Sequence, residues 1–209
     1  GTLNVQNLNV GRLARSQTLQ SDITGQARID LALPADRLPL SGTYAVNAGE
    51  VQIAGYEVRD LVAEGRIDGQ TIRVDANAVA YGGRASAAGT VRTGGAPALD
   101  LSGRASNVDL RNLPPALNAP GVASDIDADY RLTGRGRQFS GDVRFHASTL
   151  AGATISPGTT AHFNVGAGAP RYSAKGEVAN LDVQQIRRGF KITAHGGDRF
   201  RSTLNRTFA

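Results

Sequence analysis

Alternation of apolar and polar residues with a period of two runs through most of the sequence and stays in phase across successive turns. Over residues 61–91 one set of positions is aliphatic or small, while the other set carries most of the charged and amide residues. A slip of one residue would send every side chain to the opposite face, so agreement across two turns strongly constrains the fold. The pattern predicts half-buried antiparallel strands joined by tight hairpin turns.

Two glycine-containing dipeptides mark the predicted turns of this region. Asp68-Gly69 and Gly82-Gly83 are expected to be the two-residue loops of consecutive hairpins. In that register the opposed residues next to the turns are Ile67 and Gln70, and Ala80 and Ala85. The same alternation returns in residues 126–147, on both sides of a Gly-Arg turn.

A short phrase, N-[LV]-[ND]-[VL]-x-x-[LI], occurs three times, at residues 7–13, 107–113 and 180–186. Its unequal spacing excludes a solenoid of fixed period and fits modules that contain different numbers of hairpins. Helix is expected only in the tails of this phrase, where an acidic residue caps one turn and Pro114-Pro115 limits the length. The phrase therefore predicts short helical plugs, with module boundaries near residues 13, 113 and 186.

The apolar positions between residues 72 and 91 are mostly alanine and glycine. Two packed sheets must fill a space about 10 Å thick with side chains, and few large ones are available here. An open, curled sheet would instead offer a channel for hydrocarbon, whose burial yields about 0.8 kcal/mol per methylene. The predicted fold is all-β: an elongated, twisted antiparallel sheet curled into an open groove, continuous over residues 1–209 of a longer chain.

The residues expected to line this groove belong to the apolar set, and each could equally belong to an ordinary protein core. They are Leu61, Ile67, Ile72, Val74, Ala76, Ala78, Val91, Ile126, Tyr130, Leu132, Phe139, Val143, Phe145, Phe163, Val165, Tyr172 and Val178.

Two stretches resemble the AsmA-like family (AsmA/TamB-type bacterial envelope proteins). They are "NAVAYGGRASAAGTVRTGGAPALDLSGRASNVDLRNL" (77–113) and "LSGTYAVNAGEVQIAGYEVRDLVAEGRIDGQTIRVDA" (40–76). The resemblance implies a repeating β-groove, or β-taco, in the periplasm, on a chain whose inner-membrane anchor lies outside this segment. It also implies phospholipid acyl chains as partners and, for some members, a role in assembling outer-membrane proteins.

Catalytic and metal-binding signals are absent from the sequence. There is no cysteine, and the three histidines, His146, His162 and His195, form no ligand motif. The D-x-D-x-D run at 125–129 lacks the glycine and glutamate of a calcium loop. The net charge is +5, but the basic residues are scattered singly apart from short clusters at Arg135/Arg137 and Arg187/Arg188, so nucleic-acid binding is not expected. We expect no catalytic residues, no metal and no cofactor.

Two alternative functions remain open on the sequence alone. One is a structural or adhesive β-module with a packed core and a partner that binds outside. The other is a periplasmic assembly factor whose open sheet edge captures strands of outer-membrane proteins through backbone pairing.

Overall fold

The computed structural model describes residues 1–6, 21–32, 41–53, 56–93, 95–113, 121–136, 138–166 and 171–180. Within them the fold is one antiparallel sheet, open and curled, so the predicted all-β class is confirmed. One turn of 3-10 helix, η2 (Leu110–Asn112), lies between β7 and β8. The strands are β1 (Thr2–Val5), β2 (Ser21–Ala32), β3 (Ser41–Ile53), β4 (Tyr56–Asp68), β5 (Thr71–Ala80), β6 (Gly83–Arg92), β7 (Ala98–Val108), β8 (Ser124–Arg135), β9 (Gln138–Phe145), β10 (Ser148–Leu150), β11 (Ala153–Ile155), β12 (Thr160–Val165), β13 (Arg171–Lys175) and β14 (Val178–Ala179).

The topology is an up-and-down meander. From β1 to β8 each strand pairs with the next one in the chain. Beyond β8 the strands are interrupted: β9 and β10 pair with the two halves of β8, β12 pairs with β9 and β13, and β11 pairs with β10 and β14. The meander therefore holds from β1 to β9, whereas three later pairs, β8 with β10, β9 with β12 and β11 with β14, join strands that are not consecutive in the chain.

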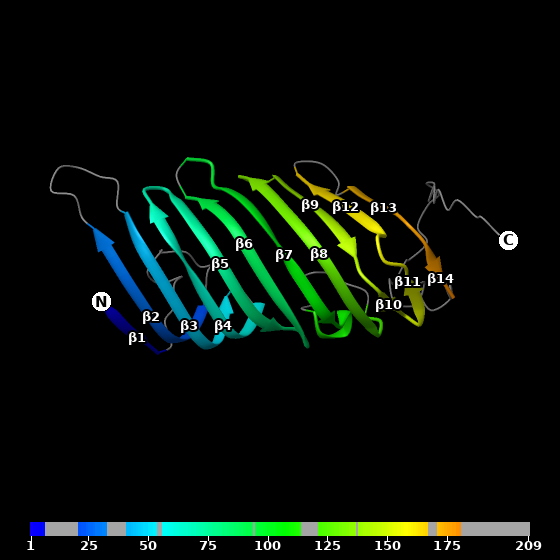
Figure 1. Cartoon of the computed structure of the whole chain (residues 1–209), viewed down its shortest axis with the longest axis horizontal. Coiled ribbons are helices and arrows are strands. Elements are labelled where there is room, and N and C mark those ends of the chain that lie inside the picture. Colours follow the sequence, from blue (N-terminus) through cyan, green and yellow to red (C-terminus); the bar gives the residue numbers. More distant parts are fainter. Residues whose placement is uncertain are drawn as a thin grey trace.

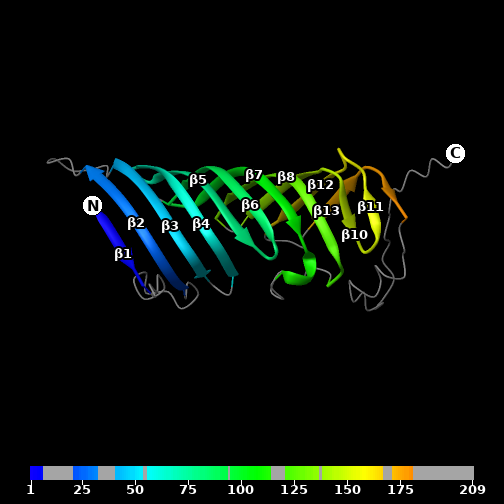
Figure 2. The same ribbon diagram turned by 60° about the horizontal axis from the view of Figure 1, so that its bottom comes forward.

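Figure 1 shows an elongated layer whose strands run obliquely to its long axis, with β1 at one end and β13 and β14 at the other. The layer is curled, as the turned view in Figure 2 makes clear. The hairpin turns after β4, β6 and β8 lie along one long edge, which we call the upper edge, as in Figure 1. The turns after β5 and β7 lie along the opposite, lower edge.

The two predicted hairpin turns are each displaced by one residue. Gly69-Gln70 forms the first loop and Tyr81-Gly82 the second, so Ile67 pairs with Ile72 and Ala80 with Gly83. The predicted partners were therefore wrong. Each register differs from the prediction by two positions, an even number, so every side chain keeps its predicted face.

Tertiary contacts explain why the second loop contains Tyr81, a non-glycine residue with φ of 54°. The backbone N–H of Glu57 donates to the Tyr81 hydroxyl at 3.1 Å, and the Asn112 side chain donates to the Tyr81 carbonyl at 3.3 Å. Gly82, with φ of 83°, supplies the second positive φ, as a two-residue type I′ loop requires. Residues distant in sequence thus select this loop over Gly82-Gly83.

The first residue of the repeated phrase has the same backbone conformation in two copies, of which the one at 180–186 is described only at Asn180. Asn107 and Asn180 both adopt the left-handed conformation, with φ of 56° and 57°, which asparagine tolerates better than most residues. At the first copy, Asp125 and Asp127 on β8 accept hydrogen bonds from the side chain and backbone of Asn107, each at 3.2 Å. The aspartate run therefore anchors the end of β7. The copy at residues 7–13 lies outside the described residues.

The predicted plug after β7 is a single helical turn, as Pro114-Pro115 suggested. Asp109 is its N-cap and accepts from the Arg111 backbone N–H at 3.0 Å. β7 and β8 stay paired beside this plug, with one register shift between Ala105 and Val108. The second predicted plug and the boundaries near residues 13 and 186 fall outside the described residues.

The capping carboxylate of Asp109 gives a pH-dependent prediction. Hydrogen bonds from the Arg111 side chain and backbone lower the pKa of Asp109 to about 2. Because the folded-state pKa is lowered, the cap stabilises η2 above the ordinary aspartate pKa and is lost as the pH falls through about 2. We expect an NMR titration to place the Asp109 midpoint near 2 and Arg111→Ala to move it upward. A midpoint near 4 in the unsubstituted protein would contradict this cap.

Candidate functional site

The apolar side chains of successive strands form continuous rows across one face of the sheet, which we call the apolar face. The pairing registers place the residues of one such row directly opposite one another from β2 to β13. In order they are Ile29, Tyr44, Gly65, Val74, Gly89, Leu101, Leu132, Gly141, Phe163 and Tyr172. The apolar surface therefore extends along the molecule without a break between strands.

Alanine residues show which face is sheltered, because their side chains are the same size on both. Ala63, Ala76 and Ala87 on the apolar face are half-buried, whereas Ala45 and Ala88 on the polar face are exposed. The difference reflects the curl of the sheet and not side-chain length. The apolar face is thus the sheltered inner face, as the groove prediction requires.

The inner face is not covered by a second layer of protein among the described residues. The buried hydrophobic residues there are few and mostly small: Ala48, Val51, Ala128, Ala151, Ala153 and Ile155. Large side chains such as Leu101, Leu132 and Phe163 remain partly accessible. The geometry is an open groove with an accessible apolar lining, and not a packed sandwich.

All the residues predicted to line the groove lie on this face. Most are half-buried: Leu61, Ile67, Ile72, Val74, Ala76, Ala78, Val91, Ile126, Tyr130, Leu132, Val143, Phe145, Phe163 and Val165. Phe139, Tyr172 and Val178 are more exposed, at 42%, 76% and 43%. Tyr172 and Val178 lie on β13 and β14, where no further described strand shelters them.

The sequence prediction omitted several lining residues. Leu99 and Leu101 on β7 complete the rows between β6 and β8, and Tyr44 and Val46 extend them onto β3. The sequence pattern could have identified Leu99 and Leu101, because both alternate with polar residues. The pattern around Tyr44 was weaker because the polar face there includes Ala45.

Two tyrosines bridge three strands on the inner face. Tyr44 on β3 lies beside Gly65 on β4 and donates its hydroxyl to the Arg73 carbonyl on β5 at 3.1 Å. Tyr130 on β8 repeats this arrangement in the opposite direction. It lies beside Gly103 on β7 and donates to the Ser86 carbonyl on β6 at 2.7 Å.

The glycines are required for these bridges because the rings occupy the space of their missing side chains. A β-carbon on Gly65 or Gly103 would lie 2.8 Å from the hydroxyl of Tyr44 or Tyr130, respectively. Burial raises the pKa of both tyrosines, so both hydroxyls stay protonated and donate near neutral pH. The rings shield strand backbone that glycine would otherwise leave open.

The inner face is bulky near the upper edge and small toward the lower edge. Next to the upper turns, Ile67, Ile72, Val91 and Leu99 face one another in sequence. Two rows nearer the lower edge are formed by small residues, which are Ala63, Ala76, Ala87 and Gly103, and Ala78, Ala85, Ala105 and Ala128. The groove therefore has an aliphatic wall and a smooth floor of small residues.

The polar face carries cross-strand ion pairs. Arg131 on β8 pairs with Asp100 on β7 at 3.0 Å, and this hydrogen bond lowers the pKa of Asp100. His162 Nδ1 lies 2.9 Å from Asp142, and His146 Nε2 lies 2.8 Å from Asp129. Both described histidines thus have partners of the kind that an exposed strand surface provides.

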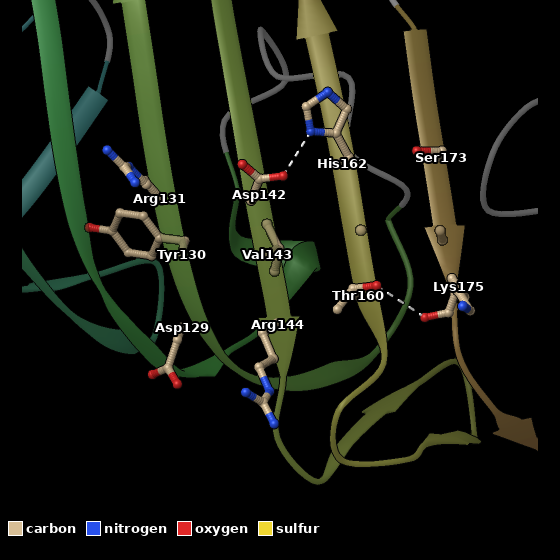
Figure 3. A pocket seen from close by; sticks show the side chains of 12 residues that line it. Asp129, Tyr130, Arg131, Asp142, Val143, Arg144, Thr160, His162, Ser173 and Lys175 are labelled. Atoms are coloured by element: carbon tan, nitrogen blue, oxygen red, sulfur yellow. Dashed lines mark hydrogen bonds and ion pairs between the residues drawn. The ribbon is translucent and has the colours of Figure 1, made fainter.

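A cleft of about 570 Å³ lies over β8, β9, β12 and β13 (Figure 3). Asp142, His162 and Ser173 line it and are direct cross-strand neighbours, the residue types of a nucleophilic triad. No hydrogen bond joins His162 to Ser173 in the described structure, and all three residues are exposed. Without a bond from His162 to Ser173, the three side chains of this cleft do not form an assembled nucleophilic triad in the described structure.

Among the described residues, no cluster of three or more His, Cys, Asp or Glu residues could hold a metal ion. No described helix is long and apolar enough to cross a membrane.

No protein-family model matches the sequence, and neither the curated proteins nor the solved structures include a significant match. The apolar groove is therefore the candidate site that the geometry itself supports.

Proposed function

We propose that this chain is a segment of a lipid-transport bridge in the bacterial cell envelope, in which the groove shields phospholipid acyl chains from water between the two membranes. The proposal includes a periplasmic location and an inner-membrane anchor outside this segment, as the resemblance to AsmA-like proteins implies. Phospholipid would be the partner, with no cofactor and no catalytic step.

One observation carries the proposal: the apolar inner face is continuous across the strands, and no other described residues cover it. In a packed module the same side chains would be buried against a second layer, and among the described residues they are not. An uncovered apolar surface of this extent is costly in water and typical of a binding surface. A row without breaks suits a ligand that moves along it, because each methylene finds equivalent contacts at every strand.

The length of the apolar lining along one strand matches the length of an acyl chain. Ile72 and Ala78 mark the wall and the floor on β5, and six residues of strand span about 20 Å. A leaflet's hydrocarbon layer is about 15 Å thick, half of the bilayer core. An acyl chain could therefore lie along the strands with its whole length against apolar side chains.

Site-directed photocrosslinking tests the proposal. We would place a photoreactive amino acid at Ile72 and, separately, at Val143, in the full chain expressed in bacteria. Matched controls are the adjacent residues Arg73 and Arg144, which are exposed on the polar face. We expect phospholipid adducts, identified by mass spectrometry, at Ile72 and Val143 and not at the two controls.

The other outcomes separate the alternatives. Absence of lipid adducts at all four positions would favour a structural module. Adducts with outer-membrane protein strands at positions on β13, in place of lipid adducts in the groove, would favour the assembly factor, because the outer edge of that strand has no described partner.

A further inference from the structure

The junction between β7 and β8 contains specific polar contacts at the lower edge of the sheet. The backbone and the side chain of Asn107 donate to Asp127 and Asp125, respectively, each at 3.2 Å. The Ser124 hydroxyl accepts from the Leu110 backbone N–H at 2.7 Å. The end of β7 therefore binds the Ser-Asp-Ile-Asp start of β8 through side chains as well as through backbone pairing.

The same junction occurs a second time, between β1 and β2. The dipeptide Ser-Asp occurs twice in the sequence, at the starts of β2 and β8, and each time it follows a copy of the repeated phrase. Val5 and Ala105 hold equivalent positions, two residues before the asparagine of their copies. Val5 opposes Gly25 and Ala105 opposes Ala128, and each partner lies four residues after its serine. The two strand pairs thus share one register.

The last described strand, β14, ends as β7 does. Asn180 has the left-handed φ of Asn107, 57° against 56°, at the same position of the phrase. Val178 is the counterpart of Ala105, and it opposes Ile155 on β11 as Ala105 opposes its partner on β6. β13 and β14 lie at the end of the layer (Figure 1), and no described strand lies on their outer side. This outer side corresponds to the side of β7 that β8 occupies.

Exposure along β13 and β14 differs from exposure along β7. All the described residues from 171 to 180 are exposed. Val178 is 43% exposed although it lies on the inner face, whereas its counterpart Ala105 is half-buried. A sheet edge offers a row of backbone N–H and C=O groups to an added strand, and such a strand would shelter these side chains.

We propose that the outer edge of β13 and β14 is a docking site for one kind of strand, which opens with Ser-Asp-x-Asp as β8 does and pairs in the register of β7 with β8. Asn180 binds the two aspartates of this strand as Asn107 binds Asp125 and Asp127. In this chain β2 and β8 already have β1 and β7 on the equivalent side, so the occupant is the first strand of another module of the same kind. The side-chain contacts make the site selective among strands, and the pairing does not require lipid in the groove.

Disulfide trapping tests this register, because the sequence contains no cysteine of its own. The full chain carries Val178→Cys or, separately, Ala174→Cys, both at exposed positions of the inner face. The probes are synthetic peptides of residues 124–135 that contain either Ala128→Cys or Leu132→Cys. Because Ala128 and Leu132 oppose the β7 counterparts of Val178 and Ala174, each protein variant has one matched and one mismatched peptide. Circular dichroism verifies that each protein variant keeps its strand content.

We expect each variant to form the mixed disulfide at least about tenfold faster with its matched peptide, because cysteines whose Cα atoms are more than about 7 Å apart cannot be bridged without backbone movement. The preference should therefore reverse between the two protein variants. Replacing Asp125 and Asp127 with alanine in a matched peptide should slow the reaction about tenfold, since hydrogen bonds to charged groups are stronger than neutral ones.

Asn180→Ala in the protein should slow the reaction of the matched peptide in the same way. Asn77→Ala is the matched control, because Asn77 is exposed on the polar face of β5, and this variant should react like the parent. Equal rates for matched and mismatched peptides would show that the edge imposes no register. Unchanged rates without the aspartates would show capture of any strand by backbone pairing alone. Either result overturns the proposal, as does the absence of any mixed disulfide, which would mean that the edge does not accept a strand.

Discussion

Replacing Gly103 with alanine is expected to destabilise the sheet by about 3 kcal/mol, a large effect for the addition of one methyl group. A β-carbon at this position would overlap with the carbonyl oxygen of Ser86 on the neighbouring strand and lie 2.8 Å from the Tyr130 hydroxyl. Strand backbone cannot move aside as a side chain can. The methyl group would also break the bond from Tyr130 to the same carbonyl.

Gly49→Ala is the matched control for this substitution. Gly49 also lies in a strand, but a β-carbon there would contact nothing within 4 Å, and its φ is not in the left-handed region. Alanine at this site should be neutral or stabilising by up to about 1 kcal/mol, because it reduces the entropy of the unfolded chain. Thermal unfolding followed by circular dichroism compares the two variants, and equal stability would show that β6 and β7 do not approach so closely.

Introducing a carboxylate on the groove floor is expected to weaken lipid binding strongly without unfolding the protein. Ala76 lies directly opposite Ala63 and Ala87, so a glutamate there has space. In the empty groove its carboxylate meets water, whereas a bound acyl chain would desolvate it at a cost of several kcal/mol. Ala76→Glu should therefore lower acyl-chain retention by at least about tenfold.

Asn77→Glu provides the control because Asn77 is adjacent in the chain and exposed on the polar face. This variant should retain fluorescent phospholipid like the parent. Retention by Ala76→Glu should recover as the pH falls below the ordinary glutamate pKa of about 4.3, where the side chain becomes neutral. Equal retention by both variants near neutral pH would mean that acyl chains do not contact the floor.

The assignment of residues to the two faces was predictable from sequence, and the exact register was not. Displacing the loops at Gly69 and Tyr81 by one residue changed every cross-strand partner of β5, yet it preserved the faces because the shift was even. Loop choice depends on tertiary contacts such as the bond from Glu57 to Tyr81, which local sequence does not reveal.

The tyrosine bridges also show that the sequence predicts the face of a residue but not its partners on other strands. Tyr130 was expected on the inner face from its alternation with Asp129 and Arg131. Its position beside Gly103, and its bond to Ser86 two strands away, depend on the register of three strands at once.

The pairing of each strand with its successor affects both how this sheet folds and how its length can change in evolution. Because strands β1 to β8 each pair with their successor, no contact between distant strands has to form before this part of the sheet can assemble, which favours faster formation than a topology with crossovers. A new hairpin can join the growing edge as soon as its own residues are available, without waiting for a distant partner. Lengthening by whole hairpins would leave existing strand pairs undisturbed, so the span of the molecule could be adjusted in evolution by insertion or loss of a few dozen residues.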